Sequence, residues 1–307
     1  MKPAVKIQFV EAWTRYMEVS SALPAPPPPV ATRVVKSLDE LISEYDVFVL
    51  DAWGVLNLGS EPIGESRAAF AALRRSGKTI RVLSNDGSSD AAGAAARHQA
   101  RGFDVRSDEI IFGLDLLEGC LTSAGLRPED VTVICPPPLP RAALTSRMRS
   151  FDRHEVDRDD TCAAFAFLSN GDFDDEDEQA LSRALVRRPR PLFVCNPDLV
   201  SPEPQGMVIE PGFQAFRAAA SAGLRPTFLG KPFPEVYALL RSSLGTQRGL
   251  DGARILAVGD TPQTDILGAR LAGFHTLLVG GGFLRGQDMA ARVLECGISP
   301  HFMSAGL

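Results

Sequence analysis

Four short apolar runs, spread over more than 200 residues, each lead directly into polar residues. Runs of this kind are typical of strands buried on both faces of a parallel sheet. In open α/β sheets the ligand crevice lies at the carboxyl ends of such strands. The pattern therefore predicts a Rossmann-like α/β fold with a single site. The runs are Val47–Leu50 before Asp51, Ile80–Leu83 before Ser84 and Asn85, Thr227–Gly230 before Lys231, and Ile255–Val258 before Gly259 and Asp260.

The residues after these runs indicate phosphoryl chemistry. Asp51 and Asp260 are the kind of carboxylates that hold Mg²⁺ together with waters and a phosphate oxygen. Lys231 offers a fixed cation for phosphoryl oxygens. Asp265 is a candidate support that orients a metal-bound water or pairs with Lys231. The alternative for Asp265 is a cap on a helix predicted over residues 266–272, and the two roles are compatible.

The order of these residues resembles the motifs of the haloacid dehalogenase superfamily, whose members mostly hydrolyse phosphate esters through an aspartate nucleophile. Only 32 residues separate the first two motifs, whereas 145 separate the second from the third, so a large insertion lies between motifs two and three. That position is the mark of the superfamily's C2 cap group. The matching residues are Asp51 for motif one, Ser84 and Asn85 for motif two, Lys231 for motif three, and Asp260 with Asp265 for motif four.

Local segments narrow the resemblance to the class IIA, NagD-like branch, and it covers roughly residues 38–282. Within that branch, a subset of bacterial sequences has Asp-x-Trp-Gly in motif one, as this chain has at Asp51–Gly54. The resemblance implies a Rossmann-like parallel-sheet core with an inserted α/β cap domain, a C2 cap of subtype A. The segments are Gly59–Gly64, Asn196-Pro197-Asp198, and Gly230-Lys231-Pro232 with Tyr237.

The resemblance also implies roles for individual residues. Asp51 would be the nucleophile, with Ser84 and Lys231 as further catalytic residues. Mg²⁺ would be held by Asp51, the backbone carbonyl of Trp53 and Asp260, with Asp265 in support. The substrate would be bound by residues beside the motifs and at the end of the cap, namely Ala52, Asn85, Asn196 and Asp198.

Trp53 departs from the pattern, because phosphatases of this superfamily usually carry Asp-x-Asp in motif one. An indole donates one hydrogen bond and has no useful acid or base function, so Trp53 cannot protonate a leaving alkoxide. Losing a positioned acid or base costs on the order of 10²–10⁴ in rate. Slow turnover, or a leaving group that needs little protonation, is therefore expected.

The pattern along the chain predicts three regions. Residues 1–35, which contain the run Pro24–Pro29, are expected to form a disordered tail because a stiff polyproline segment cannot join a core. Residues 36–108 and 202–307 are expected to form the core domain, and 109–201 the C2 cap. The core should begin with a helix capped by Ser37, with Glu40 completing a capping box.

Composition narrows the class of partner. A net charge of −6 and a pI near 5.4 argue against nucleic acid or an anionic membrane. The five cysteines show no Cys-x-x-Cys spacing, and no signal-type or membrane-spanning run precedes the core, so a cytoplasmic protein with free thiols is expected. The four histidines form no metal-ligand pattern. Class IIA relatives often pair through their caps, which makes a homodimer one expectation.

Three functions remain open from the sequence. The leading hypothesis is a Mg²⁺-dependent phosphatase that hydrolyses a small phosphorylated metabolite, such as a sugar phosphate, a nucleotide, or an acyl or aryl phosphate, through an aspartyl-phosphate. The second is a non-catalytic protein that binds a phospho-ligand. The third is a haloacid dehalogenase, which also has an aromatic residue after the nucleophile but carries its cap between motifs one and two.

Overall fold

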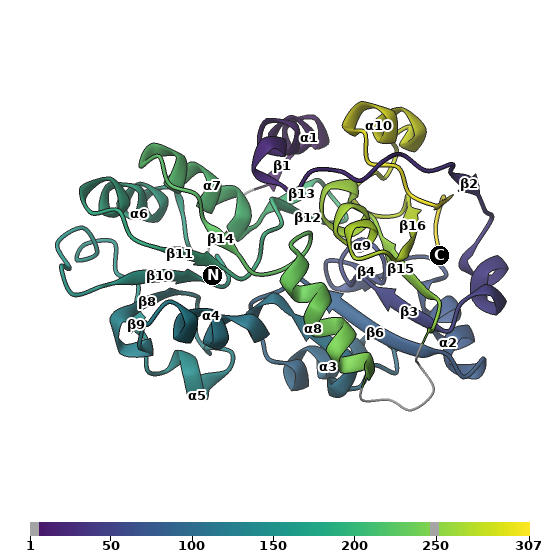
Figure 1. Ribbon diagram of the computed structural model, residues 1–307, viewed down its shortest axis with the longest axis horizontal. Coiled ribbons are helices and arrows are strands. Elements are labelled where there is room, and N and C mark those ends of the chain that lie inside the picture. Colours follow the sequence, from purple (N-terminus) through teal and green to yellow (C-terminus); the bar gives the residue numbers. More distant parts are fainter. Residues whose placement is uncertain (1–5, 246–251) are drawn as a thin grey trace.

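The computed structural model describes residues 6–245 and 252–307, which form two α/β domains (Figure 1). The larger one, the core domain, is built on a seven-stranded sheet in which all neighbouring strands are parallel. Three of the four apolar runs lie side by side in it, as predicted. In spatial order its strands are β2 (Arg33–Val34), β17 (Phe302–Ser304), β16 (His275–Val279), β15 (Ile255–Gly259), β3 (Val47–Leu50), β6 (Thr79–Ser84) and β7 (Ile110–Phe112).

Helices cover both faces of the core sheet. As a result, every residue of the central strand β3 is buried. Side chains of a strand alternate between the two faces. Phe48 and Leu50 pack in one cluster with α2 and α3, and Val47 and Val49 pack in another with α8 and α9. The helices of this domain are α2 (Ser66–Arg75), α3 (Ala91–Ala100), α8 (Pro234–Gly245), α9 (Leu267–Leu271, preceded by a π-helical turn at Pro262–Ile266) and α10 (Met289–Cys296).

The smaller domain, the cap, contains a parallel five-stranded sheet with helices on both faces. Phe165 and Phe167 face α6 and α7, whereas Ala164 and Ala166 face α4 and α5. In spatial order the strands are β14 (Thr227–Phe228), β11 (Leu192–Val194), β10 (Ala164–Phe167), β8 (Val131–Ile134) and β9 (Arg149–Ser150). The helices are α4 (Leu117–Ser123), α5 (Ala142–Thr145), α6 (Asp175–Arg187) and α7 (Pro211–Ser221).

The cap differs at both ends from the predicted range 109–201. Its predicted first residues form β7, which pairs with β6 and belongs to the core sheet. Beyond residue 201, α7 packs against α6, and β14 pairs with β11. The apolar run Thr227–Gly230 before Lys231 therefore contains a strand of the cap sheet, not of the core sheet. A two-residue parallel strand is buried in the same way in either sheet, so the pattern of apolar residues does not say which sheet it joins.

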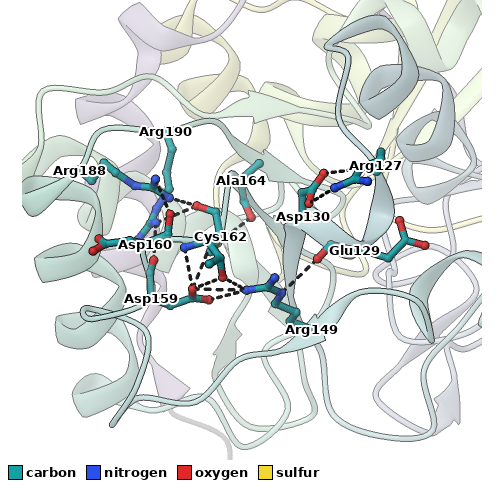
Figure 2. A network of polar contacts seen from close by, with 11 residues as sticks. Arg127, Glu129, Asp130, Arg149, Asp159, Asp160, Cys162, Ala164, Arg188 and Arg190 are labelled. Atoms are coloured by element: carbon teal, nitrogen blue, oxygen red, sulfur yellow. Dashed lines mark hydrogen bonds and ion pairs between the residues drawn. The ribbon is translucent and has the colours of Figure 1, made fainter.

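Polar contacts fix the loop between β9 and β10 at the edge of the cap (Figure 2). Arg149 pairs with the Asp159 carboxylate at 3.1 Å, and Asp159 accepts the backbone N–H of Thr161 at 2.8 Å. Arg190, only 7 % exposed, donates to the carbonyl of Cys162 at 2.9 Å. These guanidinium groups are engaged by carboxylates and carbonyls of the loop, so the network has a structural role.

The N-terminal segment is ordered from residue 6, and the prediction of a disordered tail is wrong over residues 6–35; residues 1–5 lie outside the described residues. Strand β1 (Lys6–Ile7) pairs with β13 (Met207–Ile209), which in turn pairs with β12 (Val200–Pro202). Helix α1 (Phe9–Glu18) follows directly. The proline-rich stretch is also held, since the carbonyl of Pro28 accepts a hydrogen bond from Arg270 at 2.7 Å.

Helix α1 packs because its apolar residues recur at helical spacing, a signal obscured by the charged residues between them. Trp13 and Tyr16 are 4 % and 2 % exposed and lie against the ring of Phe283, with centroids 6.2 and 5.4 Å away. The Tyr16 hydroxyl also accepts the N–H of Leu199 at 3.2 Å. The segment thus joins the core to the base of the cap, as its position above both in Figure 1 shows.

Trp13→Ala is expected to lower the free energy of unfolding by about 3–5 kcal/mol, because it removes a buried indole from this junction. Val10→Ala on the same helix is the control, since Val10 is 72 % exposed. We expect Val10→Ala to change stability by less than about 0.5 kcal/mol. Urea denaturation measures both. Equal, small effects of the two substitutions would mean that α1 does not pack on Phe283 in solution.

Smaller elements complete the fold. The helix predicted after Ser37 is a 3-10 helix in which Ser37 makes no capping bond, and Glu40 accepts the N–H of Lys36 at 2.9 Å instead. All five cysteines are free thiols. Among the described residues, no helix is long and apolar enough to cross a bilayer. The remaining elements are a hairpin of β4 (Asn57–Leu58) and β5 (Glu61–Pro62), and 3-10 helices at Ser20–Ala22, Leu38–Glu44, Ser107–Glu109, Gly113–Leu116 and Pro128–Asp130.

Candidate active site

The carboxyl ends of three neighbouring core strands form the base of the site. Strand β3 lies between β15 and β6; the chain continues from β3 towards one edge of the sheet and from β15 towards the other. Such a reversal of strand order opens a crevice for a ligand. Asp51 follows β3, Asp260 follows β15, and Ser84 ends β6. The three residues predicted from separate parts of the sequence are therefore brought to one place.

Three carboxylates converge in this crevice. Asp51, Asp260 and Asp265 each offer one oxygen, and these oxygens lie within 4.8 Å of one another. Burial, together with the charges of Asp265 and Asp51, raises the pKa of Asp260 well above its ordinary value. A divalent cation would remove this unfavourable concentration of charge, and oxygen ligands suit Mg²⁺ or Ca²⁺. The residues present thus fit a divalent metal ion.

Asp260 is held in a fixed orientation by neutral donors. Its Oδ2 accepts the backbone N–H of Phe283 at 2.6 Å, and its Oδ1 accepts the hydroxyl of Thr261 at 3.0 Å. Phe283 is the residue on which helix α1 packs. The N-terminal segment therefore supports the backbone that positions this carboxylate.

Lys231 lies between two of the carboxylates. Its Nζ is paired with Asp51 Oδ1, and with Asp265 Oδ1 at 2.7 Å. Burial alone would lower the pKa of Lys231, but the charges of Asp265 and Asp51 outweigh burial and raise it well above its ordinary value. The other oxygen of Asp265 accepts the N–H groups of Asp260 and Thr261, both at 3.1 Å. Asp265 therefore pairs with Lys231, one of its predicted roles; it lies inside the helical turn Pro262–Ile266 and is not the N-cap.

Asn85 connects the core to the segments that return from the cap. Its side chain accepts the N–H of Lys231 at 2.8 Å and donates to the Lys231 carbonyl at 3.1 Å and to Asp198 Oδ1 at 2.9 Å. Asn196 Oδ1 accepts the N–H of Asp198 at 3.1 Å, and its Nδ2 donates to Glu210 at 2.9 Å. The amide groups of Asn85 and Asn196 are thus occupied in positioning neighbouring residues.

Trp53 lines the site, but its indole offers no acid or base group. The guanidinium of Arg101 lies 5.4 Å from the centre of the indole ring.

The residue after Trp53, Gly54, has a φ of +86°, and a Cβ there would overlap Asp260 Oδ2. The turn after Asp51 therefore needs glycine at 54 to let Asp260 approach.

Gly54→Ala is expected to destabilise the protein by about 1–3 kcal/mol more than Gly64→Ala, because only Gly54 would place a methyl group on Asp260. Gly64 is a matched control, since it also has a positive φ, +39°, and nothing lies within 4 Å of the position that its methyl group would take. Urea denaturation in Mg²⁺ and in chelator compares the two. We expect Mg²⁺ to stabilise Gly64→Ala as it does the unmodified protein, and to stabilise Gly54→Ala less.

A cavity of about 290 Å³ opens above these residues, between the core and the cap. All the site residues predicted from the sequence line it except Ala52, which is buried. The sequence prediction missed Asp86 and several groups on the cap side, including Asn170, Ser201 and Glu210. Glu210 directly follows β13, but β13 pairs antiparallel with β12 and β1, so the rule for the carboxyl ends of parallel strands gives no signal for it.

Two stretches of the chain match known families. The family described as haloacid dehalogenase-like hydrolase matches residues 48–144, and the HAD-hydrolase-like family matches residues 228–302. Dihydroxyacetone phosphatase of Corynebacterium glutamicum is 35 % identical over 91 residues, which are 29 % of this chain and 32 % of the relative. D-glycerol 3-phosphate phosphatase of Mycobacterium tuberculosis is 27 % identical over 246 residues, covering 79 % and 65 % of the two chains. The match therefore spans less than two thirds of each of these two relatives.

Solved structures share the fold over nearly the whole chain. A haloacid dehalogenase superfamily protein from Cytophaga hutchinsonii superposes with a TM-score of 0.76 at 22 % identity, covering 90 % of this chain and 98 % of its own. Glycerol phosphate phosphatase of Mycobacterium tuberculosis, crystallised with magnesium, gives a TM-score of 0.66 at 22 % identity, covering 89 % and 77 %. The chain thus shares its fold with these structures, and two of its stretches, residues 48–144 and 228–302, which contain all four motifs, belong to haloacid dehalogenase-like hydrolase families.

Proposed function

We propose that this protein is a Mg²⁺-dependent phosphatase that hydrolyses a small phosphorylated metabolite through an aspartyl-phosphate on Asp51. One observation carries the proposal. The Asp51 carboxylate lies beside Asp260 and Asp265 in a site suited to a divalent ion, and it is paired with Lys231. A nucleophile, a metal site and a cation are thus combined at one point, which is what phosphoryl transfer requires.

The reaction divides into two displacements at phosphorus. An oxygen of Asp51 attacks the phosphoryl group, and the bond to the leaving oxygen breaks as that oxygen takes up a proton. Water then attacks the phosphorus of the aspartyl-phosphate, which releases inorganic phosphate and restores the Asp51 carboxylate. Asp51 and Asp260, with the backbone carbonyl of Trp53, would hold Mg²⁺, which offsets the charge of the phosphoryl oxygens when it is bound.

Lys231 and Ser84 act on the phosphoryl oxygens in this scheme. Lys231 provides a positive charge that Asp265 holds in place, so little rearrangement is needed as negative charge develops. The Ser84 hydroxyl lines the cavity and accepts the N–H of Asp86 at 3.1 Å, which leaves its own proton to donate. Both residues therefore contribute by positioning and charge.

The cavity supports a small, polar leaving group. Its volume is about 290 Å³, and hydroxyl, amide and carboxyl groups of the cap face it. Lys231 is the one lysine or arginine among the described residues that line it, and Lys231 belongs to the phosphoryl site. Two relatives of this chain are a dihydroxyacetone phosphatase and a D-glycerol 3-phosphate phosphatase. We therefore assign a hydroxylated monophosphate without a second anionic group as the substrate.

Release of inorganic phosphate from a panel of monophosphates tests the proposal. The panel contains glycerol phosphate, dihydroxyacetone phosphate, hexose phosphates, nucleoside monophosphates, acetyl phosphate and 4-nitrophenyl phosphate, each with Mg²⁺ and with chelator. We expect Mg²⁺-dependent release from at least one of them, and none above the blank with Asp51→Asn. Tight binding of a monophosphate without any release would instead identify a phospho-ligand-binding protein.

A further inference from the structure

The proposed reaction needs a proton for the leaving oxygen, and Trp53 cannot supply one. The donor must therefore be another titratable side chain of the cavity. Among the described residues, those that line it are Asp51, Asp86, Asp198, Glu210, Lys231, Asp260 and Asp265. Asp51, Lys231, Asp260 and Asp265 are already used in the phosphoryl site, so the choice lies among three carboxyl groups.

Asp86 is tied to a cation. One of its oxygens pairs with Arg97 at 2.6 Å, and the other accepts the N–H of Ser88 at 2.8 Å. Both carboxylate oxygens of Asp86 are thus occupied by donors of its own loop and of α3, so Asp86 has a structural role at the wall of the cavity.

Glu210 has a different environment. Its Oε1 contacts the Ser201 hydroxyl at 2.6 Å and its Oε2 contacts the amide of Asn196 at 2.9 Å, both of which are neutral. No ion pair joins it to a lysine or arginine in the described part of the chain. The Glu210 backbone is also fixed, because its N–H donates to the carbonyl of Leu199 at 2.9 Å where β13 meets α7. Glu210 is partly buried, and a carboxyl that is shielded from water and has only neutral partners favours its protonated form.

We propose that Glu210, provided by the base of the cap, is the general acid that protonates the leaving oxygen, and then the general base that deprotonates the attacking water. The assignment rests on the proposed phosphatase function. It makes Glu210 the group that takes the place of the second carboxylate missing from motif one. The cap would thereby contribute to catalysis as well as to substrate recognition.

The charges around Glu210 agree with this role. Burial raises the pKa of Glu210 to about 8; the hydrogen bonds of Ser201 and Asn196 oppose the rise, and the negative charges of Asp198 and Asp86 add to it. Burial also raises the pKa of Asp198, to about 6, against the opposing charge of Lys231. Of Glu210 and Asp198, Glu210 is thus the one with the higher pKa, and a general acid works best when its pKa lies near the operating pH.

The proton balance closes over the two steps. As the phosphorus–oxygen bond breaks, the leaving oxygen takes the proton of the Glu210 carboxyl and departs as an alcohol. The Glu210 carboxylate then accepts a proton from the water that attacks the aspartyl-phosphate. Inorganic phosphate leaves, and both Asp51 and Glu210 return to their starting forms.

The test compares Glu210→Gln with the unmodified protein on two substrates in Mg²⁺. Glycerol phosphate needs a protonated leaving group, whereas 4-nitrophenyl phosphate releases a stable phenolate. We expect Glu210→Gln to lower kcat on glycerol phosphate, or on the best alkyl phosphate of the panel, by about 10²–10⁴-fold. With 4-nitrophenyl phosphate we expect a rapid burst of nitrophenolate, close to one equivalent, followed by slow turnover, because the phosphoenzyme forms but waits for a base.

Two further measurements separate a chemical role from a structural one. The decline of kcat/KM at alkaline pH, expected near pH 8 on the alkyl phosphate, should disappear in Glu210→Gln, and Glu210→Asp should recover part of the rate. Urea denaturation checks that both variants are folded. The Asp198→Asn variant tests the rival carboxyl.

Three outcomes would overturn the assignment. One is an equal loss on both substrates without a burst, and another is no loss at all. The third is that Asp198→Asn, and not Glu210→Gln, shows the selective loss on the alkyl phosphate. If the unmodified protein releases no phosphate in an Asp51-dependent manner, the phosphatase function itself fails, and the role of Glu210 fails with it.

Discussion

Asp51→Asn is expected to lower the rate of phosphate release by on the order of 10⁶-fold, the scale of loss seen when a covalent enzyme loses its nucleophile. An amide of the same shape cannot form the aspartyl-phosphate. The loss should be in kcat, with substrate affinity largely retained, because Lys231 remains paired with Asp265. Rates with saturating substrate and Mg²⁺ measure the effect. Residual activity within 10²-fold of the unmodified protein, roughly the effect of a single hydrogen-bond donor, would exclude Asp51 as the nucleophile.

The same variant should change how stability depends on pH in the absence of metal. Burial raises the pKa of Asp51 from 3.8 to about 7, although Lys231 opposes the rise. Between pH 4 and 7, roughly, Asp51 is protonated in the folded protein but ionised in the unfolded chain. Its contribution to the free energy of unfolding therefore falls as the pH rises through this range. The amide of the Asp51→Asn variant has no such proton to lose. We therefore expect the metal-free variant to gain stability relative to the unmodified protein over this range, as measured by urea denaturation.

Lys231→Met is expected to lower the free energy of unfolding by about 3–5 kcal/mol in metal-free protein at neutral pH. It removes the cation between Asp51 and Asp265 and leaves the negative charge of both carboxylates unbalanced. Phosphate release should fall by about 10²–10³-fold, because the charge on the phosphoryl oxygens is no longer balanced. Urea denaturation and phosphate release measure the two effects.

The stability of Lys231→Met in Mg²⁺, compared with its stability in chelator, tests the role of Lys231 in a second way. Mg²⁺ should restore part of the stability lost in Lys231→Met, since it would neutralise the same carboxylates. Lys36→Met is the control, because Lys36 is exposed and lies outside the site. We expect the control to keep its stability and activity. A Lys231→Met protein as stable as Lys36→Met in chelator would show that the buried ion pairs do not form.

Much of the phosphoryl site could be predicted from sequence because the residues follow apolar strands. The neighbouring positions of β15, β3 and β6 bring Asp260, Asp51 and Ser84 together, whatever the sequence distance between them. Such strands are recognised by their length and by burial on both faces. The shared location of Asp51, Ser84 and Asp260 follows from this pattern, whereas their roles are implied by the resemblance to a known family.

The rest could not be predicted, for reasons that differ from residue to residue. The strand before Lys231 has only two residues, and its apolar pattern is the same whether it joins the core or the cap sheet. Helix α1 was missed because charged residues break its apolar stripe, which is recognised only at helical spacing. Glu210 and Ser201 belong to an antiparallel hairpin, to which the rule for carboxyl ends of parallel strands does not apply.

The packing of the N-terminal segment has a consequence for biosynthesis. Strand β1 pairs with Met207–Ile209, and α1 packs on Phe283, so neither element finds its partner until these distant residues have been synthesised. Contacts between such distant residues form late, because closing a long loop costs conformational entropy. The backbone N–H that orients Asp260 also belongs to Phe283. A nascent chain in which residue 283 has not yet been synthesised therefore lacks the donor that orients Asp260, so the arrangement of the three carboxylates is completed only after that point.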